Sequence, residues 1–264
     1  MSLPESDLAQ LKRANKLLEN PGLAAKITSA LGTPIEKGFA LLPGKWTEAV
    51  HKASEAALMK ALAVAVKSLG DQAELSSHDR MHKVAAAASG AVGGAFGLLA
   101  LAVELPISTT IMLRSIAEIA RSEGEDLQTI DAKLACLTVF ALGGRAKDDD
   151  AAESGYFAVR AGLATAVSEA ARFLAEKGLG KGAAPAVVRL ISVLGARFGV
   201  VVSEKAAAQA VPIIGAAGGA LINSIFIDHF QDMARGHFIV RRLERIYGEE
   251  VVKRAYEAAG ASVA

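Results

Sequence analysis

Hydrophobic residues recur at three- and four-residue steps along most of the chain, which is the pattern of helices with one buried face. Residues 46–69 show this most clearly, and the positions that would share a face there are Ala57, Leu58, Leu62, Ala65 and Val66. No region shows a sustained alternation of polar and apolar residues, so we expect no sheet.

Prolines, glycines and polar runs divide this pattern into separate expected helices. Pro106 is expected to begin a helix and Gly236 to end one, because proline suits a first helical turn and glycine a helix end. Short helices are expected within 21–44. The longer ones are expected over 4–18, 46–69, 106–124, 127–142, 156–177, 185–197, 212–235, 237–247 and 249–259.

Two stretches carry no charged residue: 84–103 and 206–227. Each is close to the roughly 20 apolar residues that a helix needs to cross a bilayer. Both contain glycines four residues apart, which share a helix face. Since each glycine costs about 1 kcal/mol against alanine inside a helix, their clustering predicts close helix–helix contact. The residues expected to make it are Gly90, Gly94, Gly97, Gly215 and Gly219.

The sequence leaves two interpretations of these stretches open. They could be the central helices of a bundle, which Pro212 and the polar Gln209 and Asn223 favour, or they could enter or lie in a membrane. Basic residues follow the second stretch, as is typical of a cytoplasmic membrane face. This predicted membrane or partner surface consists of Arg235, Arg241, Arg242 and Arg245.

Composition strengthens the helical prediction. The 264 residues include 54 alanines, the residue with the best intrinsic helix propensity. We therefore predict an all-α fold, a multi-helix bundle with two central glycine-rich apolar helices. The net charge is only +1, which argues against a nucleic-acid-binding protein. The single cysteine, Cys136, lies in an apolar run and is expected to be a core thiol.

Candidate chemistry is sparse. Asp228, His229 and Asp232 could share a helix face. A histidine beside carboxylates could act as a base or bind a metal, but a hydrogen bond at a helix end or between helices explains the pattern better. Glu104 ends the first uncharged stretch and needs a partner if it is buried; the candidates are Arg114 and His229. The resulting polar cluster is Glu104, Arg114, Asn223, His229 and Asp232. No metal-binding spacing occurs in the sequence, and no cofactor is expected.

The region from Val201 to Leu243 resembles the C-terminal hallmark of the EcsC protein family. The matching residues are Ser203-Glu204-Lys205, Pro212, Gly215, Gly219, Asn223, Ala234, Phe238 and Arg241-Arg242-Leu243. The segment 102–126 is also similar to the family. This resemblance implies an all-α domain over 45–264, with 1–44 as an N-terminal helical extension. The family is mainly bacterial and its namesake is encoded beside an ABC transporter, which implies membrane-linked work but no reaction or catalytic residue.

We therefore expect a non-enzymatic cytoplasmic protein, peripheral on or inserted in the inner membrane, that binds anionic lipid or a membrane protein. The family resemblance implies a link to a transporter. The alternative is a hydrolase-type enzyme that uses the Glu104, His229 and Asp232 region. A third hypothesis is a homo-oligomeric scaffold whose glycine faces meet between subunits.

Overall fold

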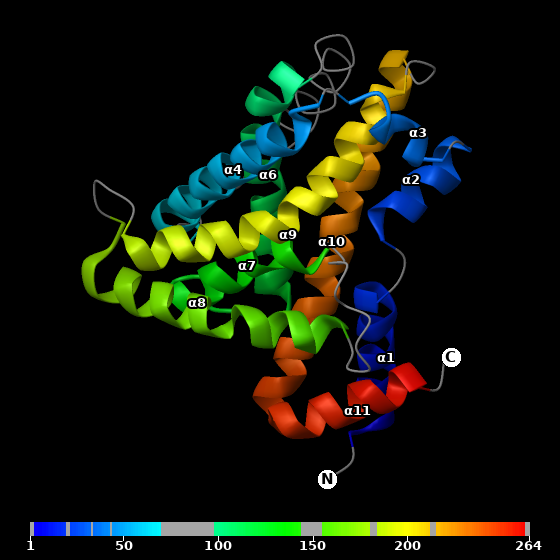
Figure 1. Cartoon of the computed structure of the whole chain (residues 1–264). Coiled ribbons are helices and arrows are strands. Elements are labelled where there is room, and N and C mark those ends of the chain that lie inside the picture. The colour runs from blue at the N-terminus through cyan, green and yellow to red at the C-terminus, as the bar shows by residue number, and fades with distance from the viewer. Residues whose placement is uncertain are drawn as a thin grey trace.

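The computed structural model describes residues 3–19, 22–32, 34–42, 44–69, 98–143, 155–179, 184–211 and 215–261, and within them all regular structure is helical. Figure 1 shows the helices packed as a bundle, with α10 running along much of its length. The helices are α1 (Glu5–Glu19), α2 (Leu23–Leu31), α3 (Glu36–Phe39), α4 (Trp46–Ser68), α6 (Leu98–Ser122), α7 (Ile130–Leu142), α8 (Gly155–Lys177), α9 (Pro185–Ala210), α10 (Gly215–Tyr247) and α11 (Glu249–Ala261). The predicted all-α, multi-helix class is confirmed.

Helix α7 lies at the centre of the bundle. Every residue from Ala132 to Ala141 is buried, and α4, α6, α8, α9 and α10 all contact it. A helix that is apolar on all sides is expected where neighbours surround it. Thr129 begins it, since its side chain accepts a hydrogen bond from the Ala132 N–H at 3.2 Å.

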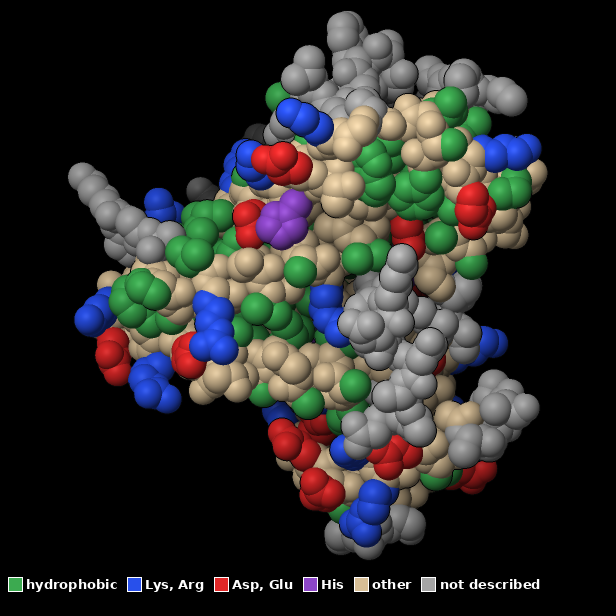
Figure 2. Space-filling model, in the orientation of Figure 1, with side chains coloured by type: hydrophobic (Ala, Val, Ile, Leu, Met, Phe, Trp, Pro, Cys, Tyr) green, Lys and Arg blue, Asp and Glu red, His purple; other side chains and the backbone are tan. Residues whose placement is uncertain are grey.

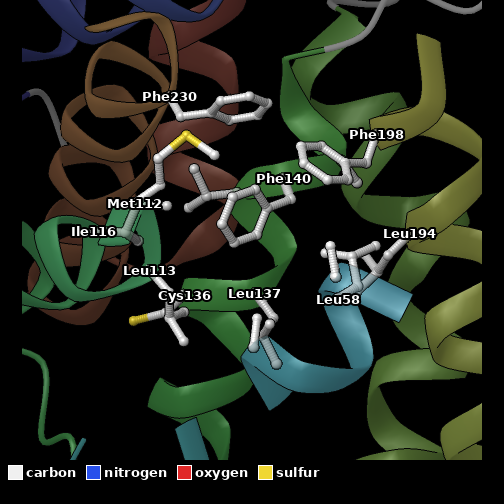
Figure 3. Close-up of a cluster of buried hydrophobic side chains, with 14 of the residues drawn as sticks. Leu58, Met112, Leu113, Ile116, Cys136, Leu137, Phe140, Leu194, Phe198 and Phe230 are labelled. Atoms are coloured by element: carbon white, nitrogen blue, oxygen red, sulfur yellow. The ribbon is translucent and has the colours of Figure 1, made fainter. Parts of the chain in front are cut away.

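The main core forms where α7 meets its neighbours. Figure 3 shows Phe140 of α7 between Phe198 of α9 and Phe230 of α10, with ring centroids 5.2 and 5.3 Å apart. Cys136 is fully buried in the same cluster, and burial raises the pKa of its thiol to about 12. The prediction of a core thiol is confirmed.

The two predicted helix boundaries at Pro106 and Gly236 are wrong. Pro106 lies inside α6, where Ser108 and Thr110 hydroxyls donate to the Leu105 and Pro106 carbonyls. Gly236 lies inside the 33-residue α10. A Cβ atom at Gly236 would be 2.6 Å from Leu18 Cγ and 3.1 Å from the Ala14 carbonyl oxygen. The glycine therefore permits close contact between α1 and α10 instead of ending a helix.

Another close contact that depends on glycine joins α3 to α9. A Cβ atom at Gly38 would lie 1.9 Å from the Ala207 carbonyl oxygen, a distance that no side chain can accept. The physical argument for close glycine packing therefore applies at positions that the sequence analysis did not single out.

The glycines that were singled out are only partly described. Gly90, Gly94 and Gly97 lie outside the described residues. Gly215 is the first residue of α10, and Gly219 is buried in its second turn. The stretch 206–227 is divided between the end of α9 and the start of α10, and the central position of the stretch 84–103 stays a prediction.

The first three helices pack against later ones. Helix α1 contacts α10 and α11, and α2 and α3 contact α9. Leu11 and Ala14 of α1 belong to a second buried cluster with Val240, Leu243 and Tyr256. The division at residue 44 stays a prediction, but the structure places these helices directly on the C-terminal half of the chain.

Candidate functional site

Three helices bring a lysine, a glutamate and an asparagine together inside the bundle. Lys205 on α9 is fully buried, and its Nζ donates to Glu104 Oε1 on α6 at 2.6 Å and to Asn223 Oδ1 on α10 at 2.9 Å. The same ammonium lies 4.6 Å from the centroid of the Phe226 ring, which adds a cation–π contact. We call Glu104, Lys205 and Asn223 the buried triad.

The buried triad is suited to holding helices together. Removing two charges from water costs several kcal/mol for each ion, and this cost is offset only when the ions are paired and hydrogen-bonded. Because each member comes from a different helix, the arrangement favours one relative position of α6, α9 and α10. No solute could reach Nζ of Lys205 unless the helices separated, since its side chain has no exposed surface.

Sequence reasoning placed Glu104 and Asn223 together but missed Lys205. A usable signal was present: Glu104 immediately follows the stretch 84–103, and Lys205 immediately precedes the stretch 206–227. Opposite charges that border two apolar stretches can pair if those stretches belong to neighbouring helices.

Arg114 is not the partner of Glu104. Both residues lie on α6, ten positions apart, which is about 15 Å along a helix. An ion pair needs an approach within a few ångströms, so the predicted pairing is excluded by helix geometry, and Lys205 takes that place.

His229 does not join the triad either. Its Nε2 lies 3.0 Å from the Gly143 carbonyl oxygen just after α7, so Nε2 carries the proton and donates. Burial lowers the pKa of His229 to about 4, against the weaker opposing effect of the Gly143 hydrogen bond. Six residues, about 9 Å of helix, separate it from Asn223 on α10. The sequence alternative to catalysis was a hydrogen bond at a helix end or between helices, and His229 makes such a bond at the end of α7.

Asp232 forms a third, separate group. It binds Lys26 of α2 at 2.9 Å and Arg235 at 3.2 Å. Its charge also acts on His229, but among the described residues no hydrogen bond or ion pair joins His229 to Glu104 or Asp232. The hydrolase alternative required these three residues to act together, and the structure gives each a different partner.

Glu204, beside Lys205, has a different environment. Its Oε2 accepts from the Ala24 N–H at 3.1 Å, in the first turn of α2. Burial raises the pKa of Glu204 to about 7, although the hydrogen bond from Ala24 acts in the opposite direction. Sequence reasoning named Glu204 only as a match to the family and not as a candidate for chemistry, because nothing in the local pattern shows that α2 would begin against α9.

The four arginines of the predicted surface are all paired within the chain. Arg241 makes a two-pronged contact with Glu125 at 2.8 and 3.1 Å, and Arg245 binds the same carboxylate. Arg242 lies 3.1 Å from Glu123, and Arg235 binds Asp232. We call Arg241, Arg245 and Glu125 the arginine clamp, because it fixes the turn after α6 to α10.

The arginine clamp also lowers the pKa of Glu125. Burial alone would raise the pKa of Glu125, but the hydrogen bonds and charges of Arg241 and Arg245 outweigh it and hold the pKa below its ordinary value. Since carboxylates compensate these arginines, little positive charge on this face is left for an external partner. Its role as a membrane or partner surface stays a prediction.

A further buried network joins α8 to α10. The Tyr156 hydroxyl lies 2.9 Å from His237 Nδ1, and Arg160 binds both Tyr156 and Glu244. Burial raises the pKa of Tyr156 and lowers that of His237.

In the described part of the chain no three His, Cys, Asp or Glu side chains converge as metal ligands.

One described helix is long and apolar enough to cross a membrane. Helix α9 has 26 residues and a mean hydropathy of 1.8 over its most apolar window, but half of that window is buried in the fold. Core helices of soluble proteins have the same properties, so length and composition alone do not distinguish the two cases.

A comparison with protein families matches residues 5–243 to the model of the EcsC protein family. The match therefore begins within α1 and includes the segment predicted as an extension. No similar chain was found among curated proteins, and none among solved structures.

Proposed function

The chain belongs to the EcsC protein family, and from its surface we propose that it is a non-enzymatic protein that works at the cytoplasmic face of the inner membrane. It would bind lipid or a membrane protein, and a link to a transporter would fit that location. The observation that supports this proposal is an apolar surface near the start of α6, where the structure leaves large aliphatic side chains in water.

Val103 is 67% exposed, the highest value among the exposed large hydrophobic side chains of the described residues, and Ile107 is 41% exposed. They lie four positions apart on α6, hence on one face. Val103 is also the last residue of the uncharged stretch 84–103. Contiguous exposed apolar surface is typical of sites that contact a membrane or a protein, and we propose that Val103 and Ile107 belong to such a surface.

The arginines of α10 do not support the proposal, because Glu123, Glu125 and Asp232 compensate them. The apolar surface of α6 supports it instead. This makes burial of hydrophobic area, and not charge at the C-terminal end, the expected source of affinity.

Membrane fractionation of cells that make the full chain, with vesicle flotation of the purified protein, tests the proposal. We expect the protein in the membrane fraction, and we expect the Val103→Asp/Ile107→Asp double variant to be released from it. Ile246→Asp is the control. Ile246 is also an exposed aliphatic residue, at 59%, but it lies near the C-terminal end of α10 and not on α6. A wild-type protein that stays in the soluble fraction and does not float at any salt concentration would overturn the proposal.

A further inference from the structure

The segment after α2 exposes apolar and basic side chains side by side. We call residues 37–46 the α3 tip, of which Pro43 lies outside the described residues. Leu41 is 55% exposed, and Lys37 and Lys45 are exposed on either side of it. Figure 2 shows hydrophobic side chains gathered in the upper part of the visible face, where Figure 1 places α3 and the second half of α9.

The α3 tip is held firmly to the bundle. Gly38 lies so close to the Ala207 carbonyl group that no Cβ atom would fit. Ile35 is buried just before it, and the rings of Phe39 and Trp46 pack across the turn, tilted by 44° with their centroids 5.6 Å apart. Phe39, Leu42 and Trp46 are only partly buried against the main core. Leu41 is therefore presented on a fixed base, which reduces the ordering cost of binding.

The charges of the α3 tip differ from those of α10. Neither Lys37 nor Lys45 forms an ion pair with a residue that the structure describes, whereas each of the four α10 arginines does. No acidic residue lies between the two lysines, and nearby Glu48 is paired with Lys52 at 2.6 Å. Glu36 is the one exposed carboxylate directly beside the tip.

Partly buried aromatic rings, an exposed leucine and flanking lysines form a combination suited to the boundary between lipid headgroups and acyl chains. Aromatic rings are favoured at that depth, lysine stems extend toward phosphates, and an anionic leaflet attracts basic residues close to its surface. Protein–protein interfaces are enriched in arginine and depleted of lysine, so the two lysines of the α3 tip favour lipid over a protein partner.

We propose that the α3 tip inserts into the headgroup region of an anionic lipid bilayer, with Leu41 entering the apolar layer and Lys37 and Lys45 binding lipid phosphates. This inference rests on the proposed function and adds a second lipid contact to the one proposed for the apolar surface of α6. The partner is the lipid itself, and the lipid class is one with net negative charge.

The chain carries its own probe for this contact, because Trp46 is its single tryptophan. Purified full-length protein is mixed with vesicles of phosphatidylcholine alone or of phosphatidylcholine with phosphatidylglycerol, each with and without brominated acyl chains. We expect blue-shifted Trp46 emission and quenching by brominated lipid only in the vesicles that contain phosphatidylglycerol.

Charge and apolar variants separate the parts of the contact. Lys37→Glu/Lys45→Glu should weaken binding to anionic vesicles by about 10-fold or more, and Leu41→Asp should abolish the quenching. Glu36→Gln should strengthen binding, since it removes the one carboxylate beside the tip. Lys12→Glu/Lys16→Glu on α1 is the matched control and should leave binding unchanged. All these positions are exposed, and circular dichroism of each variant checks the fold.

The outcomes distinguish this inference from the proposed function. Vesicle binding that the tip variants do not weaken, or that leaves Trp46 unquenched, overturns the inference alone. Membrane association in cells without vesicle binding in solution points to a membrane protein partner and also overturns only the inference. Failure of both assays overturns the inference together with the proposed function.

Discussion

Two groups with ion pairs connect α10 to α6 or to the turn after it, and they differ in their access to water. In the buried triad, Lys205 is fully buried and Glu104 nearly so. In the arginine clamp, Glu125 is buried but the guanidinium groups of Arg241 and Arg245 are partly exposed. The same charge types should therefore contribute very differently when one partner is lost. Loss of Lys205 would leave the buried Glu104 without a cation, whereas loss of Glu125 would leave two arginines that keep access to water.

The largest effect is expected from Lys205→Ala. The Glu104 carboxylate would stay buried without its cation, and such a loss typically costs about 3–5 kcal/mol of the free energy of unfolding. Urea unfolding followed by circular dichroism measures it. The double variant Lys205→Met/Glu104→Leu removes both charges and should cost much less. A single variant within about 1 kcal/mol of wild type would show that burial does not distinguish the two groups.

The next effect concerns Glu204, a part-buried carboxyl that binds a backbone N–H. Its pKa in the folded state is raised to about 7 from 4.5. A carboxyl group whose pKa is raised on folding destabilises the native state increasingly as pH rises from the lower value to the higher one. Glu204→Gln should therefore be more stable than wild type at pH 8, by at most about 3 kcal/mol.

The comparison is made by measuring the free energy of unfolding of wild type and Glu204→Gln from pH 5 to pH 8. The advantage of the variant should grow across this range. An advantage that is constant with pH would mean that the carboxyl group does not titrate there.

A smaller effect is expected in the arginine clamp. Glu125→Gln should cost about 1–2 kcal/mol, because hydrogen bonds to charged groups are weakened while the arginines keep access to water. The pKa of Glu125 is lowered in the folded state, so its stabilisation is present above the ordinary carboxyl pKa and is lost as pH falls through the folded value. Unfolding at neutral and acidic pH should show the variant and wild type converging in acid.

The smallest effect is expected for Arg235→Ala. Arg235 has a side chain that is 41% exposed and pairs with Asp232 three residues away on α10. Such solvent-accessible pairs contribute about 0–0.5 kcal/mol. High salt should remove whatever difference is measured. A cost above about 1 kcal/mol, unaffected by salt, would contradict the idea that solvent access ranks these pairs.

The sequence predicted the helical class and most helix ends well, since these depend on local patterns. The predicted helices at 46–69, 156–177 and 249–259 nearly coincide with α4, α8 and α11. Gly236 was misjudged because a glycine can end a helix or admit a neighbouring one, and only the position of Leu18 decides between them. Pro106 was misjudged for a different reason. The helical turns before it come from the uncharged stretch 84–103, where polar and apolar residues do not recur with a helical period.

The candidate site was predicted only in part. Glu104 and Asn223 were placed together correctly, but their common partner Lys205 could be identified only once the packing of α6, α9 and α10 was known. The pairing of the α10 arginines was also hidden, since Glu123 and Glu125 are more than a hundred residues away in sequence. Local periodicity carries no information about contacts of that range.

The docking of α1 against the second half of α10 has a consequence for synthesis. A hydrogen bond from Tyr247 to Asp7 spans 240 residues, so α1 leaves the ribosome long before α10 and finds its partners only after α10 has emerged. At about 5–20 residues per second, Leu11 and Ala14 wait on the order of ten seconds or longer before they are covered. During that interval a nascent-chain chaperone has access to an apolar face that the finished molecule conceals.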